Sequence, residues 1–561
     1  MNWYPSTGTI NFQGKEASSL KEEIEKLLNA ISGINGSTPI PACQESQIPI
    51  ENLAKPSIEQ LSEPMLSLEE KELLDNKYAN SELIIGLVAA VGTDLEHVKR
   101  VISERLPAFG YECNEIRVSR DIIKEYGHVS ETGNQFERIT AYMEEGNNLR
   151  KKAGDNSILA LGVAAKINKL RNKSNEKPLP FNKRAFIINS IKHPEEVHRL
   201  RQIYSNGFFL IGVYADEKRR FNFLTENLSI ENSHASNLIS RDADESKKNG
   251  QHTRDAFHLS DFFVHYDGNA DKFQNDIWRI LDLIFGKPFV TPTFDEFAMF
   301  MAFSASLRSA DLSRQVGAVI AKDNNIVSTG ANDVPKSGGG LYWSEYNQEG
   351  TKITDVEDGR DYKRGEDSNA VEKQKIIDNI LKCIPDELPD ELTSQFKENL
   401  KNSRIKDITE YGRVVHAEME SILACARNNI STVKTHLYCT TFPCHNCAKH
   451  IISAGISRVI YVEPYPKSKA LEFHSDSISI DKLQKLNVIF EPFVGVGPRA
   501  FFNLFSMNLG SGYTLNRKTN EGIAVEWQQS DGRLRMQMLP SSYLEREKLA
   551  ANLLLEQLHL T

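Results

Sequence analysis

The sequence has few of the features that mark secreted or membrane proteins. Seven cysteines in 561 residues are too few for a disulfide framework. No stretch approaches the run of about 18 apolar residues that a membrane-spanning helix requires. The first residues also lack the basic and apolar segments of a secretory signal. We therefore expect a cytoplasmic protein without a membrane partner.

The sequence also has fewer basic than acidic residues. The 67 lysines and arginines are outnumbered by 76 aspartates and glutamates, which gives a net charge of −9. This balance argues against a general coating of nucleic acid but not against a local basic site. Residues 150–220 contain 16 lysines or arginines against 6 acidic residues. Such a local excess is suited to contact with phosphate or RNA.

The chain is long enough for several domains. Residues 1–80 are predicted to be an extension or linker, because the stretch 32–64 carries several prolines among serine, glycine and glutamine. Short helices are predicted on either side of that stretch, at 18–31 and 67–77. Apolar runs then alternate with amphipathic helices, which predicts a parallel α/β domain over residues 81–290. Its predicted strands are residues 83–91, 185–191, 208–214 and 262–265.

A proline-containing segment at 287–292 ends this pattern and predicts a second domain over residues 291–510. A polar, acidic insertion of about residues 338–408 interrupts it, and a tail follows at 511–561 with a helix at 544–558. The other elements predicted for this domain are helices at 294–310, 417 onward and 444–453, a hairpin of 315–322 with 326–330, and strands at 435–440, 458–463 and 488–490.

The most informative residues form two short motifs, His416-Ala-Glu418 and Pro443-Cys444-His-Asn-Cys447. One histidine and two thiolates are a ligand set for a catalytic Zn²⁺ that keeps a position open for water. The pattern H-x-E…P-C-x-x-C is typical of zinc nucleobase deaminases, in which the glutamate moves protons and does not bind the metal. We predict His416, Cys444 and Cys447 as zinc ligands and Glu418 as the catalytic acid and base.

Two other interpretations of the cysteine pair are a redox pair and a structural zinc site. A redox pair would not explain His416 and Glu418. A structural zinc would need a fourth ligand, and this alternative stays open at the level of sequence. The candidates for that ligand are Cys425, Cys439, His445 and His450.

Residues 294–500 resemble the deoxycytidylate deaminase family in more than the zinc motif. Residues 308–320 are similar to that family's first helix and strand, and residues 330–335 to its G-x-N-x-x-P turn. The resemblance implies a cytidine-deaminase-like α/β/α sandwich, in which Asn332 contacts the sugar 3′-hydroxyl and Arg308 and Ser309 lie near the nucleotide phosphate. Nucleic-acid editing deaminases usually lack this front segment, so a free nucleotide is favoured over a polynucleotide.

Two lysines follow the strand predicted at 458–463. Lys467 and Lys469 lie on the same predicted loop, where their ammonium groups are suited to hold the phosphates of a free nucleotide. A solvated loop is the alternative.

Residues 82–286 resemble P-loop nucleotide and nucleoside kinases. Gly86, Gly92 and Thr93 occupy the strand–loop–helix position of a phosphate loop. The glycines are one residue too far apart for G-x-x-x-x-G-K-[ST], and no lysine precedes Thr93. This argues against phosphoryl transfer, whereas nucleotide or anion binding and a purely structural remnant both stay open.

A degenerate kinase-like domain fused to a deaminase resembles the bacterial anti-phage dCTP deaminases, and residues 491–499 are similar to that family too. The resemblance implies deamination of dCTP and dCMP, depletion of dCTP during infection, an oligomer that is commonly hexameric, and in some members restraint by a small RNA. The alternatives are a housekeeping dCMP deaminase, an RNA-binding regulator with a deaminase-fold scaffold, and an editor of tRNA or single-stranded DNA.

Overall fold

The computed structural model describes most of the chain. The described residues are 2–4, 9–11, 81–129, 133–172, 179–243, 249–383, 389–462, 468–480, 487–510 and 512–560. The chain divides into two units, residues 1–65 and 66–561. In the first unit, β1 (Asn2–Tyr4) pairs antiparallel with β2 (Thr9–Asn11). The helices predicted at 18–31 and 67–77 lie outside the described residues.

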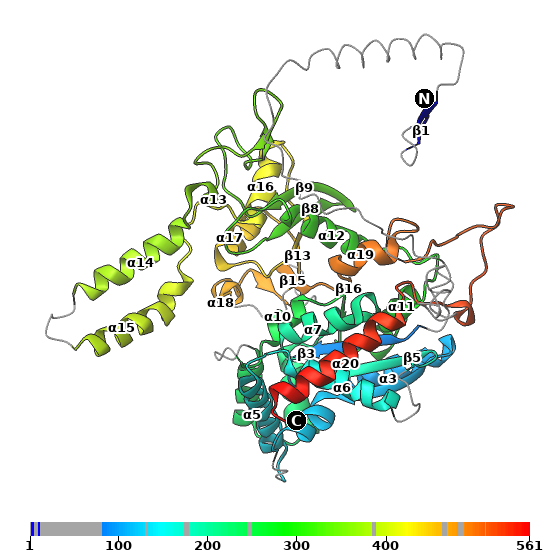
Figure 1. The fold of residues 1–561 in the computed structure, drawn as a ribbon. Coiled ribbons are helices and arrows are strands. Elements are labelled where there is room, and N and C mark those ends of the chain that lie inside the picture. Colours follow the sequence, from blue (N-terminus) through cyan, green and yellow to red (C-terminus); the bar gives the residue numbers. More distant parts are fainter. Residues whose placement is uncertain are drawn as a thin grey trace, which may run out of the picture. The chain divides into compact units, whose positions relative to one another are not determined.

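The larger unit contains two six-stranded sheets (Figure 1). The strands of the first sheet are β3 (Leu83–Ala89), β4 (Glu112–Arg117), β5 (Arg184–Asn189), β6 (Phe208–Tyr214), β7 (Phe262–His265) and β16 (Gly495–Val496). Their order is β16-β7-β6-β3-β5-β4, and β3 to β7 all run parallel. β3 and β6 are buried along their whole length, as expected of strands covered on both faces. The predicted parallel α/β arrangement is confirmed.

Helices cover both faces of the first sheet. The side chains of β3 alternate: Leu83, Ile85 and Leu87 belong to one hydrophobic core, and Ile84 and Val88 to another. The first core is closed by α3 (Leu95–Arg105) and α11 (Ala270–Ile284), and the second by α6 (Ile158–Asn172), α7 (Pro194–Tyr204) and α10 (Thr253–His258).

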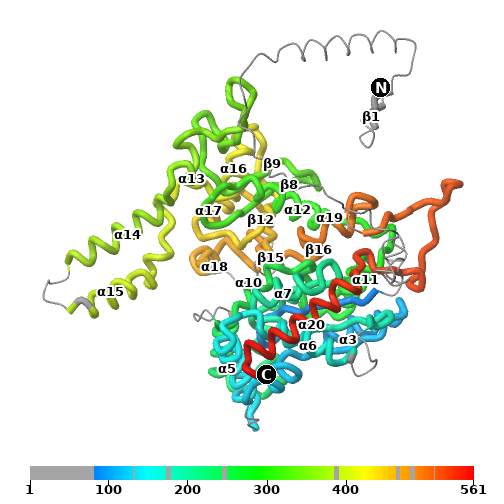
Figure 2. Tube along the Cα trace, in the orientation of Figure 1, coloured from blue at the N-terminus to red at the C-terminus, as the bar shows by residue number. Residues whose placement is uncertain are grey.

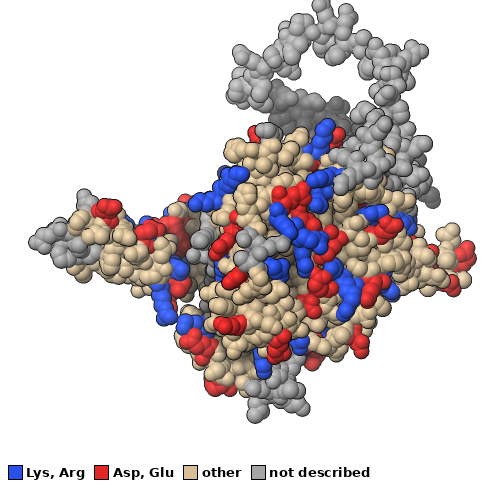
Figure 3. Space-filling view, turned by 90° about the horizontal axis from the view of Figure 1, so that it is seen from below, with Lys and Arg blue, Asp and Glu red and all other residues tan. Residues whose placement is uncertain are grey.

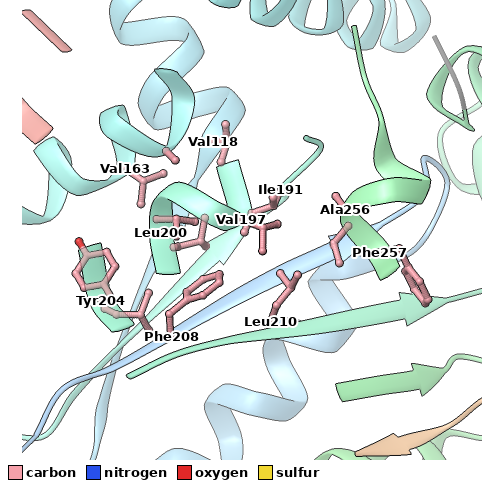
Figure 4. Packing of buried hydrophobic residues seen from close by; sticks show 14 of the residues in the cluster. Val118, Val163, Ile191, Val197, Leu200, Tyr204, Phe208, Leu210, Ala256 and Phe257 are labelled. Atoms are coloured by element: carbon pink, nitrogen blue, oxygen red, sulfur yellow. The ribbon is translucent and has the colours of Figure 1, made fainter. Parts of the chain in front are cut away.

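Figure 4 shows side chains of this second core at close range. Leu200 and Tyr204 of α7 lie beside Phe208 of β6, and all three are buried. The core therefore forms where the apolar face of α7 packs on β6, the next strand in the chain.

The second sheet is mixed. Its strands are β8 (Gly317–Lys322), β9 (Asn325–Ala331), β12 (His436–Cys439), β13 (Arg458–Tyr461), β14 (Ile478–Ser479) and β15 (Val488–Pro492), in the order β14-β15-β13-β12-β8-β9. β8 and β9 form the predicted hairpin through Asp323 and Asn324, whose φ angles of 49° and 57° suit a two-residue turn.

The second sheet is the middle layer of three. On β8, Val319 and Ala321 share a core with residues of α12 (Phe294–Ser306). Ala318 and Ile320 point to the other face, in a core with α16 (Ala417–Arg427) and α17 (His445–Ser453). The α/β/α sandwich expected from the sequence is present.

Two glycines let helices lie directly on this sheet. A Cβ atom on Gly317 would lie 1.8 Å from the carbonyl oxygen of Ala302 in α12. One on Gly330 would lie 2.2 Å from the carbonyl oxygen of Ala417, the first residue of α16. Because no other residue leaves that space, β9 and α16 approach closely and the start of α16 is held in place.

The two sheets are joined by segments far apart in the sequence. β16 follows the last strand of the second sheet, yet it pairs antiparallel with β7 of the first. The rings of Phe263 and Phe493 pack nearby, with centroids 5.7 Å apart. The C-terminal helix α20 (Pro540–Gln557) lies along α6 and α7 (Figure 2). The predicted boundaries at residues 290 and 510 stay predictions.

A buried ionic group fixes α20 to the first sheet. Arg171 of α6 lies between Glu82 and Glu547, at 2.9 Å and 2.8 Å, and all three side chains are fully buried. Tyr543 also donates a hydrogen bond to Glu82. Burial raises the pKa of Glu547 to about 7, because the charged form loses its water.

Much of the basic excess of residues 150–220 is used in ion pairs, among the residues that the structure describes. Many of its described side chains pair with acidic residues, several of which lie far away in the sequence. The pairs include Arg150–Glu196, Lys169–Glu125, Arg171–Glu547, Arg184–Glu112, Lys192–Asp242, Arg199–Asp155 and Arg201–Asp261. On the face shown in Figure 3, basic and acidic side chains are interspersed.

The insertion after residue 338 has structure of its own. Its main elements are β10 (Glu345–Tyr346), β11 (Ile353–Thr354), α13 (Asp361–Arg364), α14 (Ser368–Leu381) and α15 (Asp390–Asn402). α14 and α15 pack against each other and project from the second sheet (Figure 1). In the part of the chain that the structure describes, no helix combines the length and apolar character needed to cross a membrane.

Candidate functional site

The three predicted metal ligands lie together at the ends of two helices. His416 immediately precedes α16, and Cys444 immediately precedes α17. The Nδ1 atom of His416 is 3.4 Å from Sγ of Cys444 and 3.3 Å from Sγ of Cys447. Among the described residues, this is the one group of three or more potential metal ligands whose donor atoms lie within 4.8 Å of one another.

These distances fit a zinc ion. A tetrahedral Zn²⁺ with Zn–N of about 2.0 Å and Zn–S of about 2.3 Å separates its nitrogen and sulfur ligands by roughly 3.5 Å. The alternative fourth ligands, Cys425, Cys439, His445 and His450, are absent from the group. Three ligands with an open position favour a catalytic over a structural site.

Helix geometry activates one of the thiols. The backbone N–H of Cys447 points at Sγ of Cys444, 3.4 Å away, so that Cys444 caps the start of α17. Hydrogen bonds from Cys447 and His416 lower the pKa of Cys444 to about 3. A thiolate at a helix N-terminus is the form that binds metal.

Glu418 lies in the first turn of α16, two residues after His416. Its side chain is buried, and this burial raises the pKa of its carboxyl group. A carboxyl group with a raised pKa is suited to holding and releasing a proton near neutral pH. The structure thus brings Glu418 and the three ligands to neighbouring helix ends.

Asn332 and Ser309 are also close to each other, at the start of the second sheet. The Oδ1 atom of Asn332 accepts from the backbone N–H of Val316 at 2.6 Å, and its Nδ2 donates to the carbonyl oxygen of Arg314 at 2.8 Å. The hydroxyl of Ser309 donates to the carbonyl oxygen of Asn332 at 2.6 Å. These bonds fix the turn, and a contact of Asn332 with a sugar stays a prediction.

The turn is tied to the metal ligands through the backbone. Asp333, the next residue, exchanges N–H and carbonyl hydrogen bonds with Val415, at 3.3 Å and 3.0 Å. Val415 precedes His416, so the turn and the zinc motif hold each other in register.

Residues 292–463 match the family described as the cytidine and deoxycytidylate deaminase zinc-binding region. Over 169 residues the chain is 30% identical to the deoxycytidylate deaminase of Enterobacteria phage T4, and the alignment covers 30% of this chain and 77% of the phage protein. This chain belongs to the deoxycytidylate deaminase family. It is a deaminase, a hydrolase, with a zinc-binding region of that family.

Other relatives of this deaminase are more distant. The deoxycytidylate deaminase of Saccharomyces cerevisiae is 23% identical over 299 residues, which covers 52% of this chain and 79% of the yeast protein. The crystal structure of dCMP deaminase from the cyanophage S-TIM5 in complex with dCMP and dUMP is 20% identical and covers 36% of this chain and 99% of that chain, with a TM-score of 0.21. The family match begins at residue 292, after α11.

The insertion of this deaminase docks beside Asn332. Arg308 donates to the carbonyl oxygen of Tyr342 at 2.8 Å, and its guanidinium lies 3.5 Å over the ring of Trp343. Arg360 lies between Asp333 and Asp355, at 3.4 Å and 3.1 Å.

Sequence reasoning missed this contribution of the insertion. The acidic residue in the G-x-N-x-x-P turn, Asp333, was the available signal, because a buried carboxylate requires a cation and the turn itself supplies none.

The remaining predicted residues are two lysines and the three residues of the phosphate-loop-like segment. Lys469 pairs with Glu472 at 2.9 Å, and Lys467 lies outside the described residues. Gly86 is inside β3, and Gly92 and Thr93 lie in the loop between β3 and α3. Their roles in phosphate binding stay predictions.

Proposed function

We propose that this deaminase hydrolyses the amino group of free deoxycytidine nucleotides, dCMP and dCTP, to give ammonia and the uracil nucleotides. The observation that carries the proposal is the group of His416, Cys444 and Cys447 with buried Glu418 beside it. The relatives named above as deoxycytidylate and dCMP deaminases support the same substrate class.

In this proposal the three ligands hold Zn²⁺. When bound, the ion would act as a Lewis acid that makes water nucleophilic near neutral pH. His416 offers Nδ1, and the two cysteines offer thiolates at the start of α17. The carboxylate of Glu418 takes a proton from the attacking water and delivers it to the ring nitrogen N3. It then takes the proton of the new C4 hydroxyl and gives it to the amino group, so that the C4–N bond breaks and ammonia leaves. The buried position of Glu418 keeps bulk water from competing for that proton.

Arg308, Ser309 and Asn332 are the proposed contacts of the nucleotide's sugar and phosphate. Arg308 is half-buried and faces the insertion through Tyr342 and Trp343. A guanidinium that is oriented by a carbonyl and an aromatic ring is well placed to bind a phosphate. Lys467 and Lys469 are proposed as further phosphate contacts.

Ammonia release tests the activity. Zinc-loaded protein is offered dCMP, dCTP, CMP and single-stranded DNA, and we expect turnover of the deoxynucleotides. The Glu418→Gln variant should lose about 10²- to 10⁴-fold in rate while keeping its zinc. Glu420→Gln, a buried change in the same helix turn, is the matched control and should retain most activity. Equal loss in both variants, or turnover of single-stranded DNA alone, would overturn the proposal.

We infer an anti-phage enzyme of the cytoplasm that depletes dCTP during infection and acts as a homo-oligomer. Its N-terminal half or the insertion restrains it in uninfected cells, and some members of the family that it resembles are restrained by a small RNA. The sequence resemblance supports this, together with a first α/β region that a housekeeping dCMP deaminase would not need.

Infected cells separate the two roles. Cells that produce the wild type or Glu418→Gln are challenged with phage while dCTP is measured. Protection and a fall in dCTP that depend on infection and on Glu418 are expected. A constant fall in dCTP without infection would favour the housekeeping enzyme, and protection by Glu418→Gln would favour an RNA-binding scaffold.

A further inference from the structure

A second polar cluster lies at the carboxyl ends of the first sheet. From β3 the chain passes to β4 and β5 on one side of that strand, and then crosses to β6 and β7 on the other. In open parallel sheets, ligands bind outside the carboxyl ends of the strands at such a switch point. Here the segment of residues 90–94 leads from β3 into the N-terminus of α3.

A carboxylate of the chain already occupies the space in front of this segment. Asp242, in α9 (Asn232–Ala243), is fully buried. Its Oδ2 accepts from the backbone N–H of Val91 at 2.8 Å. Its Oδ1 accepts from Nζ of Lys192 at 2.8 Å and from the hydroxyl of Thr253 at 3.3 Å. Lys192 also donates to the carbonyl oxygen of Ala89 at 2.8 Å, so its ammonium is fixed in place.

The neighbouring side of the segment is closed by Arg220. Gly92 has φ of 85°, and a Cβ atom there would lie 2.6 Å from the carbonyl oxygen of Arg220. The guanidinium of Arg220 is buried and donates to the carbonyl oxygens of Ala215 and Val91, at 3.2 Å and 3.4 Å. A residue of α8 (Glu217–Asn222) therefore contacts the segment at Val91 and Gly92, beside the contact from α9.

The donors around Asp242 are those that bind phosphate at loops of this kind: a backbone N–H, a lysine ammonium and a threonine hydroxyl. All three converge on one carboxylate. A phosphate would compete for the same donors, and it would face the negative charge of the buried Asp242 carboxylate.

We propose that the carboxylate of Asp242 is a built-in ligand of the segment 90–94 and stands where a phosphate group would otherwise bind. The donors of Val91, Lys192 and Thr253 are therefore taken by the carboxylate and are not available to a nucleotide phosphate. Removing the carboxylate uncovers a site for a phosphate group, held by Val91, Lys192 and Thr253. The inference does not depend on the proposed deaminase substrate.

Calorimetric titration of the full-length wild type with Mg-ATP and with inorganic phosphate is the first test. A second titration uses Lys192→Met, which removes the ammonium at the segment and leaves the deaminase site unchanged. The affinity and stoichiometry for Mg-ATP and for inorganic phosphate should be the same in the wild type and in Lys192→Met. Saturable binding in the wild type that Lys192→Met abolishes would show a segment open to phosphate and would overturn the proposal.

Thermal unfolding of Asp242→Ala is the second test. The variant should unfold at a lower temperature than the wild type, and inorganic phosphate should recover part of the loss in a saturable way, relative to chloride at equal ionic strength. The double variant with Lys192→Met should lose the recovery, which separates this site from phosphate bound at the deaminase site.

Asp242→Asn keeps the shape of the side chain and serves if Asp242→Ala does not fold. It should bind no more phosphate than the wild type, because its amide still fills the position. A folded Asp242→Ala with no gain in response to phosphate would also overturn the proposal.

Discussion

The two sheets carry polar groups at equivalent places, just before the N-terminus of a helix, but they use them differently. Before α3, the donors of the first sheet are satisfied by Asp242 from the same chain. Before α16 and α17, His416, Cys444 and Cys447 point at one another, and their donor atoms are spaced as around a tetrahedral ion. Both clusters contain charged groups, so charge alone does not mark a functional site.

The difference lies in whether the charges balance within the chain. The carboxylate of Asp242 pairs with the ammonium of Lys192, so the charges of these two groups balance. Metal binding converts both cysteines to thiolates and leaves the imidazole neutral, so the bound cation neutralises the excess negative charge of its ligands. A buried cluster that is neutral without a ligand is structural, whereas one that needs an ion is a candidate for chemistry.

The largest expected effect is at the zinc motif. Cys447→Ser replaces a soft thiolate with a weak ligand, so the protein should lose zinc and its deaminase activity should fall at least about 10³-fold. Asp242→Asn should keep the zinc content and an unchanged rate. Metal analysis and ammonia release measure both variants. Comparable zinc loss in Asp242→Asn would break the contrast between the two clusters.

The next effect is on stability. Asp242→Ala leaves Lys192 without its buried partner, so we expect the free energy of unfolding to fall by about 4 kcal/mol. Urea unfolding followed by circular dichroism measures the loss. Lys192→Met should cost a similar amount, and the double variant little more, because both changes remove the same interaction. Additive losses would show that the two residues do not form one unit.

A smaller effect concerns pH. Burial raises the pKa of Glu547 from an ordinary value of 4.5 to about 7. The folded state thus holds this proton more tightly than the unfolded chain, and the stabilisation is complete below pH 4.5 and is lost as the pH rises through about 7. Glu547→Gln should therefore gain roughly 2 kcal/mol relative to the wild type between about pH 5 and pH 8.

Unfolding midpoints at several pH values measure this gain. Glu545→Gln, an exposed change in the same helix, is the control and should show no such trend. A difference between Glu547→Gln and the wild type that does not vary with pH would contradict the raised pKa.

The smallest effect is at the insertion. Trp343→Ala removes the ring under the guanidinium of Arg308, a contact of about 0.5–1 kcal/mol. The KM for dCMP should rise roughly two- to fivefold with kcat unchanged. Tyr346→Ala, an exposed aromatic of the same insertion, is the control and should leave KM unchanged. A fall in kcat instead would place Trp343 in the chemistry and not in substrate binding.

The sequence predicted the elements with strong local signals. β6 and β7 have the predicted bounds, and the hairpin of β8 and β9 lies where expected. β4 was missed, because its residues Glu112–Arg117 are mostly polar and a single isoleucine, Ile116, is fully buried. An edge strand of this kind has no apolar run to reveal it.

The zinc motif could be found because its residues are close in sequence. His416 and Glu418 are two positions apart, and Cys444 and Cys447 three, so the spacing itself carries the signal. Asp242 gave no such signal: it lies 151 positions from Val91 and 50 from Lys192. Pairings of that range depend on how the strands are ordered, which local patterns do not specify.

The exchange of β16 into the first sheet has a consequence for how the gene can be divided. A cut near residue 290 would leave β7 as an unpaired edge strand in the first fragment. Its partner β16, Gly495–Val496, would be in the second fragment and would have no strand to pair with there. The first fragment would also lose α20, which covers α6 and brings Glu547 to Arg171. Unpaired strand edges and uncovered apolar faces promote aggregation. We expect the two halves to be soluble when they are produced together and to aggregate when they are produced apart. The two halves therefore form one folding unit.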